Sequence, residues 1–132
     1  MSLRIALAGL ALTALTAPLA VTAPALASHG GGDAVRTHGG CAGSPTWTLK
    51  AKPDDGRIEV EGEVDSNRSG QVWDWTFKHN GSVSSRGTSR TAGASGSFSI
   101  ERRMSDLAGT DHFVFRAERR ATGQVCRGTV AL

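Results

Sequence analysis

The sequence predicts an all-β domain built from about seven antiparallel strands. From Thr46 onward, apolar and polar residues alternate with a period of two, and clusters of Gly, Asn and Asp interrupt this alternation roughly every 8 to 12 residues. No stretch that follows the N-terminal leader keeps the period of a helix. Together these observations are typical of an antiparallel sandwich or barrel.

The first two expected strands are joined by a turn. In residues 46–52 the apolar set is Trp47, Leu49 and Ala51. The sequence Pro-Asp-Asp-Gly at 53–56 follows, and its residue types favour a tight bend. In residues 57–65 the inward set is Ile58, Val60 and Val64, and acidic residues occupy the alternate positions. We expect residues 66–70 to close a second hairpin.

The next two strands carry the strongest hairpin signal of the chain. Residues 71–78 place Trp73, Trp75 and Phe77 on one face, which we expect to lie in the core. The dipeptide Asn80-Gly81 follows, and both central positions of a type I′ turn require positive φ. The polar residues 82–91 then predict an edge strand.

Three further strands complete the predicted domain. Their inward residues are Phe98 and Ile100 in 97–103, Phe113, Phe115 and Ala117 in 112–119, and Cys126, Val130 and Leu132 in 124–132. A loop at 92–96 and turns at 106–110 and 121–123 separate them. This count and spacing favour an immunoglobulin- or fibronectin-like sandwich, with a small β-barrel as the alternative. The chain has no Tyr, so the tyrosine corner of many such sandwiches is absent.

Residues 1–27 resemble a secretory signal peptide. Arg4 supplies the positive charge, an apolar stretch follows from Ile5, and Ala25 and Ala27 have the spacing of a cleavage site before Ser28. The apolar stretch is too short for a convincing membrane span. We therefore expect a secreted, extracellular protein without membrane association after cleavage, with a flexible Gly-rich lead-in at 28–40 and the sandwich domain at 41–132.

The two cysteines, Cys41 and Cys126, lie near the two ends of the expected mature chain. An even count in an oxidising compartment predicts that they form an intrachain disulfide. By loop entropy such a bond would stabilise the fold by roughly 4 kcal/mol. Buried free thiols and pairing between chains are the alternatives.

The charge pattern indicates no nucleic-acid partner. The formal net charge is +3, but the basic residues are scattered and form neither a run nor a nucleic-acid-binding motif. A mild attraction to anionic polymers at a cell surface is compatible with this charge.

One regular stripe is acidic: Glu59, Glu61, Glu63 and Asp65. We expect this stripe on a solvated outer face, paired across the sheet with residues such as Lys50 or Lys78.

The sequence predicts no catalytic residue, no metal site and no cofactor. Residues 65–70, DSNRSG, resemble the first half of a calcium loop, but Thr76 stands where that loop needs Glu and the segment lies between strands, so a hairpin turn is expected. The four histidines lack the spacing of metal ligands. A fold can also assemble a catalytic group from residues that are distant in sequence. His112, beside Asp111 and near Thr110, is the one residue around which we would look for such a group, although a structural role in a turn is favoured.

Three segments, PDDGRIEVEGEVDSNRSGQVW, DLAGTDHFVFRA and TGQVCRG, resemble a set of small exported immunoglobulin-like proteins of actinobacteria. The resemblance extends from about Cys41 to Leu132 and implies secretion, a β-sandwich and a disulfide; it transfers no binding or catalytic residue. We predict a non-enzymatic binding or interaction module at or outside the cell envelope, with a polysaccharide or a protein as partner. The alternative is a secreted enzyme inhibitor or small hydrolase with an active loop, at 92–96 or 106–111.

Overall fold

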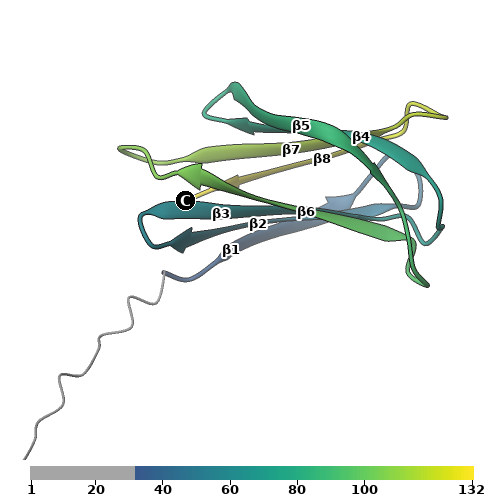
Figure 1. The fold of residues 1–132 in the computed structure, drawn as a ribbon, viewed down its shortest axis with the longest axis horizontal. Helices are drawn as coiled ribbons and strands as arrows, with labels where there is room; N and C mark the ends of the chain where they lie inside the picture. The colour runs from purple at the N-terminus through teal and green to yellow at the C-terminus, as the bar shows by residue number, and fades with distance from the viewer. Residues whose placement is uncertain (1–31) are drawn as a thin grey trace, which may run out of the picture.

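The computed structural model describes residues 32–132 and shows a two-layer sandwich of eight antiparallel strands (Figure 1). The strands are β1 Val35–Gly40, β2 Thr46–Asp54, β3 Arg57–Asp65, β4 Val72–His79, β5 Ser82–Arg90, β6 Ser97–Ser105, β7 His112–Arg119 and β8 Val125–Ala131. The predicted all-β sandwich is confirmed, and the alternative of a closed barrel is wrong. The expected signal peptide at 1–27 lies outside the described residues.

One sheet has the strand order β1-β2-β3-β6 and the other β5-β4-β7-β8. Without β1 this is an immunoglobulin-like order, in which the chain crosses between the sheets after β3, β5 and β6. The hairpin expected at 66–70 is therefore wrong, because this segment carries the chain from β3 to the opposite sheet. It is held against the β5–β6 connection instead: Ser66 N–H donates to Gly96 O at 3.0 Å, and Gly70 N–H to Thr91 O at 2.7 Å.

The strand β1 lies in the segment 28–40, where a flexible lead-in is expected from the sequence. It pairs antiparallel with β2 over its whole length. Because backbone groups make these hydrogen bonds, the strand forms without the apolar alternation that marks the others. The Thr37 hydroxyl also donates to Thr129 O at 2.9 Å, which ties β1 to β8. The sandwich thus includes residues before 41, and the described part of the chain has one more strand than predicted.

Two tight turns follow the sequence signals closely. Asn80 and Gly81 have φ of 47° and 85°, and they join β4 to β5 as predicted. Asp55 and Gly56, with φ of 53° and 77°, join β2 to β3. The second turn is shorter than the expected 53–56, because Pro53 and Asp54 still pair with β3.

The core between the sheets combines aromatic rings from the β5-β4-β7-β8 sheet with aliphatic side chains from the other sheet. The largest fully buried side chains include Trp73, Phe77, Phe113 and Phe115 opposite Leu49, Ile58, Val60 and Val64. Gly62 interrupts the aliphatic pattern of β3 because the Phe115 ring occupies the space of its side chain: a Cβ there would lie 2.6 Å from the ring. The predicted core placement of Trp73 and Trp75 is confirmed, whereas Trp47 is only partly buried.

Cys41 and Cys126 form the predicted disulfide. Cys41 lies in the β1–β2 connection and Cys126 in β8, so the bond links the two sheets at one edge of the sandwich. The alternatives of free thiols and interchain pairing are wrong. A buried disulfide is consistent with an extracellular protein. Within residues 32–132, no helix is long and apolar enough to cross a membrane.

Candidate functional site

Basic side chains gather on the outer face of the β5-β4-β7-β8 sheet. In the register of this sheet, Thr76 of β4 lies opposite Arg86 of β5 and Arg116 of β7, and Arg116 lies opposite Arg127 of β8. Directly paired residues point to the same side of a sheet, so the three arginines form one row. We use the name cationic face for the outward basic side chains of this sheet, which are Lys78, Arg86, Arg90, Arg116 and Arg127.

The acidic groups on this side are already engaged by neighbouring arginines. Glu118 accepts from Arg116 at 2.7 Å. Asp74 accepts from Arg120 at 2.6 Å and from the Thr88 hydroxyl at 2.7 Å. Hydrogen bonds from Arg120 and then from Thr88 lower the pKa of Asp74 below its usual value.

The remaining charges of the cationic face are not balanced. Among the residues that the structure describes, no ion pair or side-chain hydrogen bond involves Lys78, Arg86 or Arg127. A small pocket of about 180 Å³ lies between Lys78, Arg116 and Arg127. The face therefore has uncompensated positive charge beside a small pocket.

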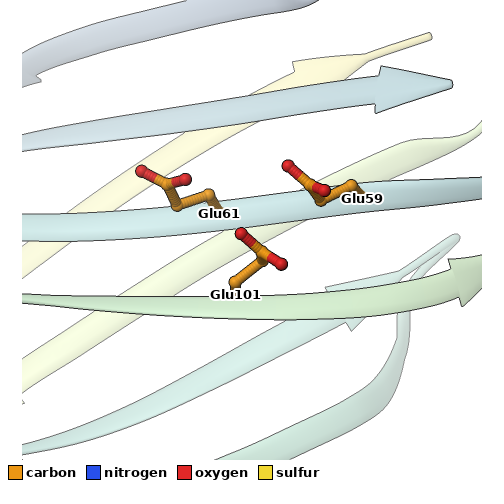
Figure 2. Close-up of side chains that lie close together, drawn as sticks. All are labelled: Glu59, Glu61 and Glu101. Carbon is orange, nitrogen blue, oxygen red and sulfur yellow. The ribbon is translucent and has the colours of Figure 1, made fainter. Parts of the chain in front are cut away.

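The outer face of the other sheet collects carboxylates. Figure 2 shows Glu59 and Glu61 of β3 and Glu101 of β6 pointing over the same part of the sheet, and one carboxylate oxygen from each lies within 4.8 Å of the other two. The Lys50 ammonium lies 3.0 Å from Glu61 and 3.7 Å from Glu59. The hydrogen bond with Glu61 raises the pKa of Lys50, although burial opposes this rise. Lys50 already supplies a counter-charge, so the cluster is a salt-linked part of the sheet.

This acidic face differs from the sequence expectation in two respects. Glu59, Glu61 and Glu63 are half-buried and not fully solvated. Lys50 is the cross-strand partner that the pattern predicts, but Lys78 lies on the opposite sheet. Glu101 joins the cluster from β6, opposite Glu61, and this pairing has no signal in the local sequence.

The carboxylate of Asp111 contacts His79, not its sequence neighbour His112. Its Oδ1 pairs with Nε2 of His79, and its Oδ2 accepts from the Leu107 amide at 3.2 Å. Burial acts to raise the pKa of Asp111, but the hydrogen bonds from His79 and Leu107 outweigh it, and the pKa lies below its usual value. The His79 ring stacks on Phe113, with 4.6 Å between the ring centres.

His112 points to solvent, and its backbone N–H donates to the Asn80 side chain at 2.8 Å. No hydroxyl or thiol within residues 32–132 hydrogen bonds to His79. The Asp111 carboxylate instead accepts hydrogen bonds from the Asn80 side chain in the β4–β5 turn and from the Leu107 amide before β7. Its backbone exchanges two hydrogen bonds with Leu132. The histidine–aspartate pair is therefore a structural anchor, and the sequence did not signal it because its members are 32 residues apart.

The segment 65–70 begins with a local turn, although it leads to the opposite sheet and does not close the expected hairpin. Asp65 Oδ1 accepts from the Asn67 amide at 3.0 Å, and Asn67 has a positive φ of 56°. This is an Asx-turn, in which the carboxylate is used by the chain's own backbone.

Comparison of the chain with protein-family models, with curated proteins and with solved structures finds no match in any of the three. The sandwich, its disulfide and the charges on its two outer faces are therefore the properties from which a function has to be inferred.

Proposed function

We propose that the protein is a secreted, non-enzymatic binding module that recognises an anionic polymer at or outside the cell envelope through the cationic face. The observation that carries the proposal is the set Lys78, Arg86 and Arg127, which lie on one side of a sheet without a carboxylate partner in the described part of the chain. On the opposite outer face, by contrast, the carboxylates of Glu59 and Glu61 have Lys50 as a partner, so positive charge there is compensated.

The shape of the cationic face suits a polymer better than a small molecule. Strands lie about 4.8 Å apart, so the row from Arg86 through Arg116 to Arg127 extends about 14 Å across the sheet. A polymer with a charge on each repeating unit can engage such a row at several points. Each exposed ion pair is weak, at about 0–1 kcal/mol, so useful affinity requires several at once.

The chemistry of arginine supports carboxylate or sulfate groups as the recognised units. A planar guanidinium offers paired N–H donors that match two oxygen atoms of such a group. Single-stranded nucleic acids are instead held on aromatic platforms. The rings of this sheet, such as Trp73 and Phe115, are buried between the layers. An acidic polysaccharide is accordingly the ligand class that the proposal names.

Retention of the purified protein on immobilised polygalacturonate tests the proposal. The variant R86S/R127S removes two charges from the cationic face, and K52S/R57S removes two exposed charges from the opposite sheet. We expect the first variant to lose affinity by about tenfold or more and to elute at lower salt, and the second to behave like the wild type.

Equal losses in the two variants would mean that net charge alone governs retention and would refute the assignment of the face. Failure of the wild type to bind polygalacturonate, dextran sulfate and a cell-wall fraction at low salt would refute the proposal as a whole. Thermal melts of both variants establish that the substitutions leave the fold intact.

A further inference from the structure

A second basic site lies at one end of the sandwich, outside the cationic face. There the β3–β4 connection and the β7–β8 turn lie at the same end of the molecule (Figure 1). Residues of both line an open depression of about 790 Å³. Three arginines line this depression: Arg68 from the first connection, Arg119 from the end of β7 and Arg120 from the β7–β8 turn. Polar Ser69 and Gln71 complete this part of the lining. No carboxylate belongs to the lining within the described residues.

Arg119 is the unusual member of this set. It is the last residue of β7 and lies opposite Trp73, so its side chain starts on the inward side of the sheet. Its Nε is covered from solvent and has no hydrogen-bond partner. Within residues 32–132, no ion pair includes its guanidinium either. Buried donors are nearly always paired, and a bound ion near the group is one explanation for a charged donor that is not. Arg119 also lines the depression, so its guanidinium charge is available to a ligand there.

Arg68 brings a second guanidinium without a protein partner in the described part of the chain, and its backbone is firmly held. The Thr91 hydroxyl donates to Arg68 O at 2.6 Å, and Ser66 Oγ accepts from the Arg68 amide at 3.3 Å. Gly96 packs so closely that a Cβ there would lie 2.2 Å from the Arg68 nitrogen. The loop therefore presents Arg68 from a defined position.

Arg120 differs because its charge is already compensated. It donates to Asp74 through Nε at 3.1 Å and through a terminal nitrogen at 2.6 Å. The hydrogen bond with Asp74 raises the pKa of Arg120 above its ordinary value. This ion pair fixes the rim of the depression, so the free positive charge within it belongs to Arg68 and Arg119.

We propose that this depression is an oxyanion site, in which Arg68 and Arg119 hold one carboxylate or sulfate-like group of a small ligand or a chain end. Both residues line the same depression, and two guanidinium groups can donate to both oxygen atoms of such a group. The anion would neutralise charges that the described part of the fold leaves unpaired. The site uses residues outside the cationic face, so it stands whether or not that face binds a polymer.

A titration followed by NMR of the ¹⁵N-labelled protein tests the site. The probes are acetate, inorganic sulfate and inorganic phosphate, each added at constant ionic strength against sodium chloride. We expect saturable shifts of the Arg68 and Arg119 Nε–Hε signals with at least one probe, and none at Arg86. The tighter probe identifies the chemistry: acetate indicates a carboxylate ligand, and sulfate or phosphate indicates a tetrahedral oxyanion.

Variants complete the test. R68S, at an exposed position, should weaken binding by about threefold or more, whereas R86S, which removes the same charge from the cationic face, should leave it unchanged. R119K keeps the charge but loses the planar fork, and should also weaken binding. Shifts that chloride reproduces, or equal affinities of R68S and wild type, would overturn the proposal. Because R68S alters an exposed side chain, it decides the question even if R119K fails to fold.

Discussion

Opening the Cys41–Cys126 disulfide should be among the most damaging changes to this fold. The bond joins residues 85 positions apart, so in the unfolded state it closes a loop that contains most of the domain. The C41A/C126A variant removes this constraint from the unfolded chain. The loop-entropy relation gives a loss of about 4.5 kcal/mol in the free energy of unfolding for a loop of this length. A domain of this size is stable by about 5–15 kcal/mol in total, so the variant would retain little margin.

The native geometry around the disulfide does not depend on the bond alone. The Ala42 amide donates to Val125 O at 3.1 Å, and the Gln124 side chain donates to Ala42 O. These contacts keep the β1–β2 connection on β8 when the sulfur atoms are removed. The loss should therefore come from the unfolded state, which becomes more expanded, and the dependence of stability on denaturant should become steeper.

Urea unfolding of the oxidised protein, the reduced protein and C41A/C126A measures this effect. Gln124→Ala serves as the matched control, because it removes a neighbouring contact without opening the loop, and should cost only about 1 kcal/mol. A loss below about 1.5 kcal/mol in C41A/C126A, with an unchanged slope, would show that loop entropy is not what the bond contributes.

Four other substitutions test the packing and the carboxylates of Glu61 and Asp111. Trp75→Ala should cost about 3–5 kcal/mol in urea melts because the ring is 4% exposed. Glu61→Ala should cost only about 1 kcal/mol, because it removes one part-buried hydrogen bond with Lys50, and the reverse order would mean that the sheet faces are misassigned. Gly62→Ala should cost about 1–3 kcal/mol, because the new methyl group meets the Phe115 ring, and a neutral result would refute that contact. The folded pKa of Asp111 is lowered, so its stabilisation is present above the unfolded pKa and is lost as pH falls through the folded value. Asp111→Asn should thus be less stable than wild type at neutral pH, with a gap that narrows below about pH 4, and a gap independent of pH would contradict this account.

Features that depend on neighbouring residues follow from the sequence alone. Strand β3 spans the predicted 57–65, because period-two alternation states which side chains face the core. The turn at Asn80-Gly81 is equally local, since positive φ is a property of those two residues. Cysteine count and expected compartment also predicted the disulfide, because with two cysteines only one intrachain bond can form.

Features that depend on pairing between distant segments needed the tertiary structure. Strand β1 was missed because backbone groups, which every residue carries, hold it on β2. The crossing at 66–70 was missed because turn-forming residues look the same whether the chain stays in one sheet or changes sheets.

The candidate sites belong to this second group. The row of Arg86, Arg116 and Arg127 is created by strand register, and the meeting of Arg68 with Arg119 by two connections that are distant in sequence. Their basic residues look scattered along the chain, and only the folding of the strands gathers them, because charge acts through distance in space while sequence records distance along the backbone.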